Sequence, residues 1–182
     1  HPLPAAPLQR GMVQRVDEAD LGRRALEQLS RRSSIERMDE GLAVRLLQGF
    51  REHRTLRVPR YTVHRSDDTT VNAMALPDGV VIVTDGLLKL VESGTASEAE
   101  LAAVLAHEVA HIELGHSREA EVRGTLSSWA TRALPMGGLV YGLVVKAGMT
   151  ALQKRSSREA EREADAWAAD LLDETGHGAE AL

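Results

Sequence analysis

One apolar segment, residues 101–114, limits the fold of this 182-residue chain more than any other. Alanine, leucine, valine and isoleucine occupy most of its positions, which predicts a helix that is buried nearly all round. Within five residues, the same segment carries three groups that can ionise: His107, Glu108 and His111. Burying such groups without partners costs free energy, so we expect the folded chain to supply a partner for them.

The three groups form the pattern H-E-x-x-H, in which His107 and His111 are four residues apart. Residues at this spacing lie about 40° apart around a helix, so both imidazoles can reach one ion. Glu108 lies between them and can hold a water molecule beside a metal and accept its proton. The alternative is a helix whose histidines make ordinary hydrogen bonds in the core, and the cost of burial counts against it.

Composition narrows the chemistry of the metal site. The chain has no cysteine, which excludes a disulfide scaffold, a cysteine zinc finger, an iron–sulfur site and a thiol nucleophile. A metal would therefore be bound by histidine and carboxylate side chains. Two imidazole nitrogens and one carboxylate oxygen leave a fourth position open on zinc, so we expect one Zn²⁺ per chain.

The third ligand is expected on the last helical segment, residues 156–174. Glu161 and Asp165 lie about 40° apart on such a helix, on the face that also carries the apolar side chains. This geometry selects Glu161 as the third ligand and places Asp165 to accept a proton from a ligand imidazole. Three further acidic residues fall on the opposite face, where exposure to solvent is expected: Glu159, Glu163 and Asp170.

The rest of the chain is interpreted as helices around a small sheet. Apolar residues at helical spacing in residues 11–50 predict two helices, the second beginning at a capping box in residues 33–36. Residues 58–84 are rich in strand-forming residues and turn at residues 77–79, Pro-Asp-Gly, which predicts an antiparallel sheet. A further capping box, residues 97–100, begins the buried helix. We expect an α+β fold, mainly helical, with the small sheet beside the H-E-x-x-H helix.

The chain length suits one domain with a single core. Residues 1–10 are rich in proline and predict a linker or a processed start. The remaining residues, 11–182, are expected to form one domain in three parts, namely N-terminal helices, a small sheet and a metal-binding helical part: residues 11–57, 58–92 and 97–182.

The charge of the chain argues against a nucleic-acid partner. Its 22 basic and 27 acidic residues give a formal net charge of −5, and it has few aromatic residues. It therefore offers neither an excess of positive charge nor a set of rings on which bases could stack.

Residues 134–152 form an apolar run with two interpretations. Its length is sufficient to cross the apolar core of a bilayer, but Pro135, Lys146 and four glycines make it a weak membrane-spanning segment. We favour a helical hairpin or lid within the domain. Peripheral membrane contact through this run is the alternative.

Three blocks of the sequence carry a resemblance to a known family. Residues 71–88 read VNAMALPDGVVIVTDGLL, residues 107–116 hold H-E-x-x-H and a further histidine, and residues 157–165 read SREAEREAD. Together they resemble the gluzincin metallopeptidases of the HtpX and CAAX-prenyl-protease type, and most closely the soluble BepA-like periplasmic branch. The first block departs from the family pattern N-A-F-x-x-P-G-G at Met74, where an aromatic residue is usual, and at Asp78, where glycine is common.

The resemblance covers about residues 58–180 and implies a zincin-type metallopeptidase domain. It implies a catalytic base at Glu108 and three zinc ligands: His107, His111 and Glu161. The implied function is a zinc-dependent metalloendopeptidase that hydrolyses internal peptide bonds of unfolded or misassembled proteins in quality control. The implied location is extracytoplasmic, in the bacterial periplasm or at a membrane.

Two other functions stay open. One is a zinc-stabilised chaperone or assembly factor with little or no proteolysis, which the complete H-E-x-x-H disfavours because zinc binding alone does not need Glu108. The other is a membrane-bound enzyme that processes prenylated proteins.

The expected partner is a polypeptide substrate that binds as an extended strand along residues 71–75, held by its backbone. Asn72 and Ala73 are the candidates for substrate contact, and local turn hydrogen bonds are the alternative for Asn72. His177 is either a plug that reaches the zinc in a resting state or an ordinary loop histidine. The group that stabilises the oxyanion stays open among four residues: Tyr61, Tyr141, His116 and His177.

Overall fold

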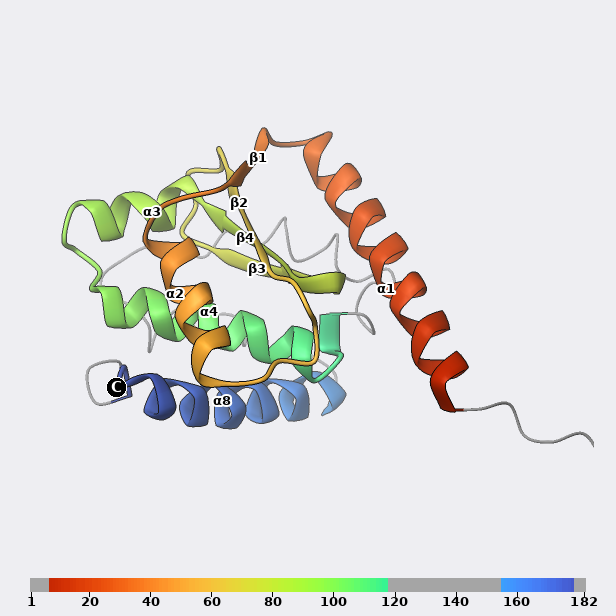
Figure 1. Cartoon of the computed structure of the whole chain (residues 1–182). Coiled ribbons are helices and arrows are strands. Elements are labelled where there is room, and N and C mark those ends of the chain that lie inside the picture. The colour runs from red at the N-terminus through yellow and green to blue at the C-terminus, as the bar shows by residue number, and fades with distance from the viewer. Residues whose placement is uncertain (1–6, 118–154, 179–182) are drawn as a thin grey trace, which may run out of the picture.

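The computed structural model describes residues 7–117 and 155–178 of the chain. In this part, helices pack on both faces of a four-stranded sheet (Figure 1). The helices are α1 (Pro7–Ser30), α2 (Leu42–His53), α3 (Asp85–Glu92), α4 (Glu98–Glu113) and α8 (Arg155–Thr175). The strands are β1 (Ile35–Met38), β2 (Thr62–Ser66), β3 (Ala73–Leu76) and β4 (Val80–Thr84), with the 3₁₀ turn η1 (Pro77–Gly79) between the last two. This arrangement confirms the mainly helical α+β fold.

The sheet is mixed, which corrects the antiparallel sheet expected from the sequence. Its strand order is β1-β2-β4-β3. The turn at η1 does produce an antiparallel β3–β4 hairpin, and β1 pairs antiparallel with β2. However, the second strand of the hairpin inserts beside β2 and runs parallel to it. The turn residues of a hairpin determine how its own strands pair, and they do not determine which strand lies next to it.

The N-terminal region also differs from the expectation. The predicted second helix would include residues 35–38, but these residues form β1, in which Ile35 pairs with Ser66 and Met38 with Val63. Helix α2 begins only at Leu42, because Gly41 has a φ of +114°, which a helix cannot contain. Pairing with the edge of β2 thus overrides the local helical pattern. Helix α1 begins at Pro7, inside the stretch that was expected to be a linker.

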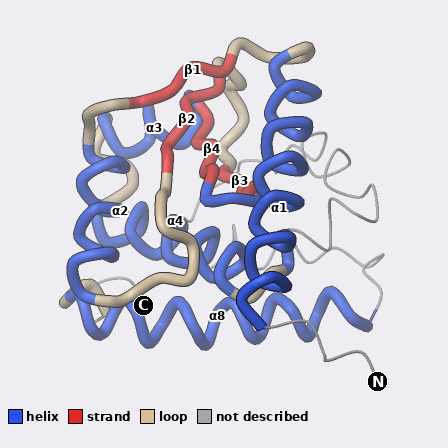
Figure 2. Tube along the Cα trace, turned by 45° about the vertical axis from the view of Figure 1, so that its right-hand side comes forward, coloured by secondary structure: helices blue, strands red, loops and turns tan. Residues whose placement is uncertain are grey.

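The two faces of the sheet bury different sets of side chains. Ala75, Val81 and Val83 point into the main core, which α2, α4 and α8 complete. The alternate strand residues point the other way, where α1 covers them in a second, smaller core (Figure 2): Met74, Leu76 and Ile82. Gly22 lets α1 approach closely, because a Cβ at this position would lie 2.4 Å from the carbonyl oxygen of Pro77.

Helix α4 lies in the centre of the main core, as its apolar sequence predicts. Both hydrogen bonds of the expected capping box are present: the Ser97 hydroxyl accepts from the Glu100 N–H at 3.1 Å, and the Glu100 carboxylate accepts from the Ser97 N–H at 2.6 Å. Leu101, Leu105 and Val109 are fully buried between the sheet and the other helices. The core therefore holds α4 rigidly, together with any group that it carries.

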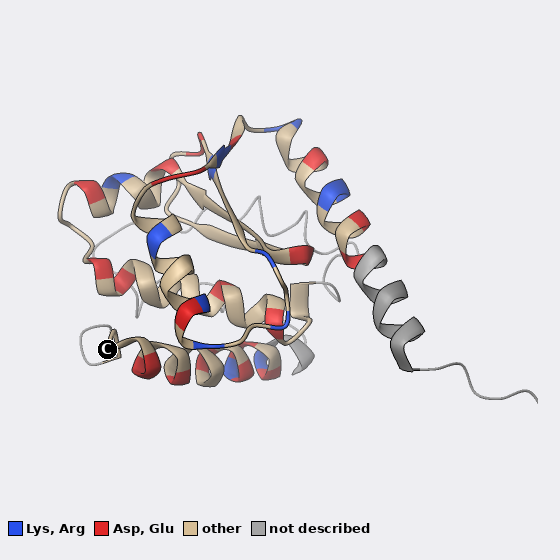
Figure 3. Cartoon of the chain, viewed as in Figure 1, with Lys and Arg blue, Asp and Glu red and all other residues tan. Residues whose placement is uncertain are grey.

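Helix α8 packs along α4 and exposes its outer face (Figure 1). Its buried side chains lie toward the core: Ala164, Ala168, Leu171 and Leu172. Charged residues of both signs follow its outer turns (Figure 3), and Glu159 and Glu163 are among the exposed ones, as the helix pattern predicts. A left-handed Gly176, with a φ of +79°, follows the end of the helix.

Among the described helices, none has the length and apolar character needed to cross a membrane. The predicted lid or membrane-contact segment, residues 134–152, lies outside the described residues, as does Tyr141.

Candidate metal centre and active site

The packing of α4 against α8 brings together His107, His111 and Glu161. The two imidazoles face each other with their Nε2 atoms 3.0 Å apart. One carboxylate oxygen of Glu161 lies 3.3 Å from Nε2 of His107, and the other lies 3.6 Å from Nε2 of His111. Two imidazole nitrogens and the two oxygens of one carboxylate thus converge from two helices that are distant in the sequence.

These spacings fit a zinc ion. Zinc binds imidazole nitrogen and carboxylate oxygen at about 2.0–2.2 Å, so two ligand atoms of a tetrahedral site lie about 3.3 Å apart. The two nitrogens are 3.0 Å apart and each lies 3.3 or 3.6 Å from an oxygen of Glu161, and one ligand atom from each of the three residues lies within 4.8 Å of the other two. The donor set of two nitrogens and one carboxylate also leaves a coordination position free for water or substrate. The residues therefore suit zinc in both chemistry and spacing.

Burial and charge act together on the group, whose side chains are only 7–13% exposed. Burial alone would lower the pKa of His107, but the carboxylates of Asp165, Glu161 and Glu108 outweigh it and raise that pKa to about 10. Burial alone would raise the pKa of Glu161, but its contacts with the two histidines lower that pKa to about 2. The pocket therefore stabilises a negative carboxylate beside positive charge, which a dication can supply.

Glu108 is not part of the three-residue group but belongs to the same helix turn. Its burial raises the pKa of its carboxyl, although His107, His111 and a hydrogen bond from the backbone N–H of Ala75 act in the opposite direction. The hydrogen bond with Ala75 joins the ligand helix to strand β3. A carboxylate whose conjugate acid has a raised pKa is a stronger base than that of an exposed glutamate.

Asp165 lies one turn after Glu161 on α8, where the helix pattern predicts it. Its Oδ1 is 2.9 Å from Nδ1 of His107, the ring nitrogen that faces away from His111 and Glu161. The ring N–H does not point straight at this oxygen, so the contact is a close ion pair rather than a well-aligned hydrogen bond. A carboxylate in this position orients the ring and keeps Nε2 available as a ligand.

The outer nitrogen of His111 has a different neighbour. Its Nδ1 lies 3.2 Å from Nδ1 of His116, and Nε2 of His116 lies 3.2 Å from a carboxylate oxygen of Glu163. Sequence reasoning missed both contacts, since it considered His116 for the oxyanion and Glu163 for solvent. The sequence signal that could have indicated them is Gly115, since a glycine just after a helix is typical of a left-handed turn. In the structure Gly115 has a φ of +81° and turns the chain back after α4.

The two residues expected to contact substrate differ in how their backbones are used. Asn72 bonds inward to β4: its carbonyl accepts from the Thr84 N–H at 3.1 Å, and its own N–H donates to the Thr84 hydroxyl at 2.9 Å. Backbone groups alternate along an antiparallel strand, so those of Ala73 and Ala75 point away from β4, toward the edge of β3 that pairs with no strand among the described residues. The edge therefore offers Ala73 and Ala75, and the sequence did not single out Ala75.

The two other oxyanion candidates in the described part of the chain are Tyr61 and His177. The Tyr61 hydroxyl donates to the carboxylate of Glu113 at 2.6 Å, and burial together with this hydrogen bond raises the pKa of Tyr61. His177 follows the end of α8, and the helix rises about 21 Å between Glu161 and Thr175. His177 is therefore not placed to act as a zinc plug in this structure.

Comparison with known proteins identifies the family. The family model described as "Peptidase family M48" matches residues 44–182, more than half of the chain. The chain belongs to peptidase family M48. This match confirms the resemblance that the three sequence blocks carry.

Several curated relatives of this M48 domain are named as proteases. It is 31% identical over 122 residues to "Metalloprotease LoiP" of Escherichia coli, covering 64% of this chain and 45% of that protein. It is 31% identical over 128 residues to "Metalloprotease YcaL" of the same organism, covering 67% and 47%. It is 30% identical over 133 residues to a "Putative beta-barrel assembly-enhancing protease" of Vibrio cholerae, covering 67% and 27%. The chain thus spans less than half the length of these relatives.

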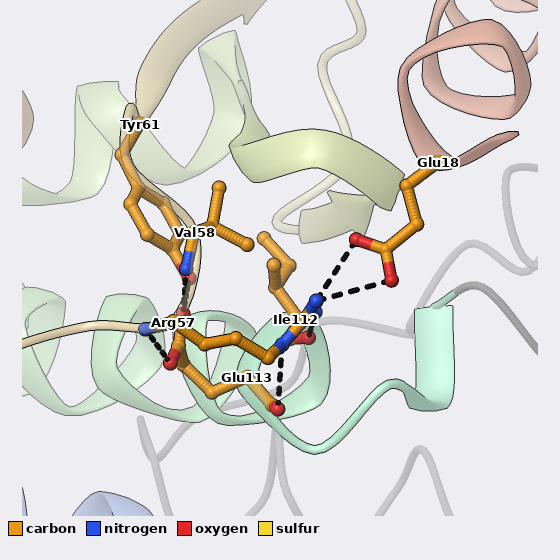
Figure 4. A network of polar contacts seen from close by, with 6 residues as sticks. All are labelled: Glu18, Arg57, Val58, Tyr61, Ile112 and Glu113. Atoms are coloured by element: carbon orange, nitrogen blue, oxygen red, sulfur yellow. Dashed lines mark hydrogen bonds and ion pairs between the residues drawn. The ribbon is translucent and has the colours of Figure 1, made fainter. Parts of the chain in front are cut away.

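A polar network fixes the end of the M48 ligand helix (Figure 4). The Arg57 side chain donates to the carbonyls of Ile112 and Glu113, at 2.6 and 3.2 Å, and so caps the C-terminal end of α4. The same guanidinium binds both carboxylate oxygens of Glu18, at 3.0 and 3.1 Å. Helix α1 precedes the residues matched by the family model, yet Glu18 connects it to the turn that follows His111.

Proposed function

We propose that this M48 domain is a zinc-dependent endopeptidase that hydrolyses internal peptide bonds of unfolded or misassembled proteins. The observation that carries the proposal is the position of Glu108. It follows ligand candidate His107 directly on α4, and its carboxyl contacts the N–H of Ala75, on the edge of β3 that no described strand pairs with. A base thus lies beside both the metal group and the backbone edge where a peptide could bind.

In the proposed reaction, the metal is held by three residues: His107, His111 and Glu161. When bound, zinc supplies Lewis acidity, which favours deprotonation of water and polarises a carbonyl. Glu108 accepts a proton from the water whose oxygen adds to the scissile carbonyl carbon. It then returns that proton to the amide nitrogen as the C–N bond breaks, so that a carboxyl and an amine leave. The raised pKa of Glu108 suits both the acceptance and the return of the proton.

The proposed substrate lies along β3. The outward backbone groups of Ala73 and the outward carbonyl of Ala75 can form strand hydrogen bonds with an extended chain, whereas the Ala75 N–H contacts Glu108. Such pairing recognises backbone more than side chains, so it favours unfolded segments over a defined sequence. A folded protein seldom offers a free extended strand, which supports a role in protein quality control.

The names of the relatives support a location in the cell envelope. One relative is named as an enhancer of β-barrel assembly, and bacterial β-barrels of this kind lie in the outer membrane. We therefore propose that the domain acts in the periplasm or at the envelope.

Hydrolysis of unfolded casein tests the proposal, with Glu108→Gln as the central variant and exposed Glu98→Gln on the same helix as its control. Glu108→Gln is expected to lower kcat/KM about 10³-fold while zinc content is unchanged, and Glu98→Gln is expected to match the wild type. A chelator should abolish hydrolysis and added zinc should restore it. Casein hydrolysis that is the same in Glu108→Gln would refute the mechanism. Suppression of aggregation by wild type and Glu108→Gln alike, without hydrolysis, would favour the zinc-stabilised chaperone.

Ala73→Pro tests the strand edge, because proline removes an N–H that no strand in the described structure uses. We expect KM for an extended peptide to rise about tenfold, while the melting temperature changes by only a few degrees. An unchanged KM in a folded variant would exclude Ala73 from substrate binding. Met74→Pro serves as the contrast, since the Met74 N–H faces β4 and its loss should lower stability.

A further inference from the structure

His111 has a polar neighbour on the side that faces away from the ligand group. Its Nε2 faces His107 and Glu161, while its Nδ1 lies 3.2 Å from Nδ1 of His116. The His116 ring stands edge-on to the His111 ring, with 5.3 Å between centroids and 64° between planes. Nε2 of His116 in turn lies 3.2 Å from Oε2 of Glu163. Three side chains from α4, from the turn after it and from α8 thus form a line.

The protons of this line can be placed without conflict. A neutral histidine that offers Nε2 as a ligand carries its proton on Nδ1. His111 can then donate from Nδ1 to Nδ1 of His116, which must carry its own proton on Nε2. That second proton is donated to the Glu163 carboxylate, which in its ionised form accepts hydrogen bonds and cannot donate them. With the protons placed in this way, both contacts of His116 join a donor to an acceptor, and Nε2 of His111 carries no proton and can bind a metal.

We propose that His116 is a positioning residue that orients His111 as a metal ligand, and that Glu163 orients His116. The inference rests on the proposed function because it concerns the same metal group. His116 itself is not a member of that group. Glu163 lies two residues after Glu161, so α8 supplies both a ligand candidate and the carboxylate at the end of the relay His111–His116–Glu163. Such outer partners of metal ligands typically change metal affinity by ten- to a hundredfold.

The exposure of His116 and Glu163 determines how much zinc affinity each substitution is expected to cost. The His116 side chain is only 15% exposed, whereas that of Glu163 is 56% exposed. Water and salt screen an exposed carboxylate, so its removal should cost less than removal of the ring. Asparagine at position 116 offers an amide oxygen that can accept from Nδ1 of His111, which makes it the conservative replacement.

The experiment measures zinc dissociation constants of the full chain by competition with a chromophoric chelator. We expect about tenfold weaker zinc binding for His116→Ala, substantial recovery for His116→Asn and about threefold weaker binding for Glu163→Gln. Glu159→Gln is the matched control, because Glu159 is an exposed glutamate one turn earlier on α8, and it should bind zinc like the wild type. Wild-type zinc affinity in both His116→Ala and Glu163→Gln would overturn the proposal.

A second measurement reads the tautomers directly in the zinc-loaded wild type by ¹⁵N-detected imidazole NMR. The proposal requires the proton of His111 on Nδ1 and that of His116 on Nε2. A His116 proton on Nδ1 would overturn it, and this result does not depend on whether the variants fold.

These readouts are independent of peptide hydrolysis. If His116→Ala weakens zinc binding but the wild type cleaves no peptide, the proposed function fails and the positioning role stands. If the wild type cleaves casein and His116→Ala and Glu163→Gln bind zinc normally, the reverse holds. Circular dichroism in excess chelator checks that His116→Ala keeps the fold of the metal-free wild type.

Discussion

The two ligand imidazoles are oriented in different ways by the same fold. Nδ1 of His107 meets the carboxylate of Asp165 directly, at 2.9 Å. Nδ1 of His111 meets another imidazole, His116, and a carboxylate only beyond it, at Glu163. The direct contact joins a ligand to a negative charge, whereas the relay passes through a ring that can be neutral. We infer that charge contributes more to the orientation of His107, and that hydrogen-bond geometry contributes more to the orientation of His111.

The largest expected effect on zinc affinity comes from removing Glu161, the carboxylate that contacts both imidazoles. Glu161→Ala should weaken zinc binding roughly a thousandfold, since each ligand supplies a large part of the free energy of metal binding. Chelator competition measures this, with Glu159→Ala as the control on the same helix. If Glu161→Ala kept wild-type affinity, the two histidines would be binding zinc without the carboxylate from α8.

The next effect separates the direct contact from the relay. Asp165→Asn should weaken zinc binding by a few tens of fold, and Glu163→Gln by only about threefold, because Asp165 contacts its ligand without an intermediate ring. Both substitutions remove a charge and preserve shape, so one competition assay compares them. Equal losses in the two variants would show that the ring of His116 transmits the charge of Glu163 fully.

A smaller effect concerns protons. The pKa of His107 is raised to about 10, so its ring is protonated at pH 7, and a metal must displace that proton. Zinc binding should release about one proton at pH 7, and affinity should rise about tenfold per pH unit until the pH approaches 10. Titration calorimetry in two buffers of different ionisation enthalpy counts the released protons. In Asp165→Asn the release should fall, because Asp165 is one of the groups that raise this pKa. Zinc binding without proton release would contradict the ion pair described above.

Much of the ligand group could be predicted from the sequence because helix periodicity is local. His107 and His111 share a face of one helix, and Glu161 and Asp165 share a face of another, so the 3.6-residue repeat places each pair. The capping box of α4 and the turn at η1 were also readable, since both depend on residues within a few positions.

The remainder depended on contacts between distant segments. Residues 35–38 have a helical pattern but pair with β2, and β4 inserts beside β2 in a parallel pairing that no local signal specifies. The relay at His116 needs the turn at Gly115 and the docking of α8 at the same time. Glu163 shows the limit most clearly: helix periodicity predicts its exposure, and yet its carboxylate reaches His116.

Anomalous diffraction at the zinc edge, from crystals of the zinc-loaded protein, tests the central claim most directly. The account predicts one peak within bonding distance of Nε2 of His107, Nε2 of His111 and a carboxylate oxygen of Glu161, with His116 outside the ligand shell. A zinc ion bound to His116 or to Nδ1 of His111 would contradict it, as would a peak bound by other residues alone.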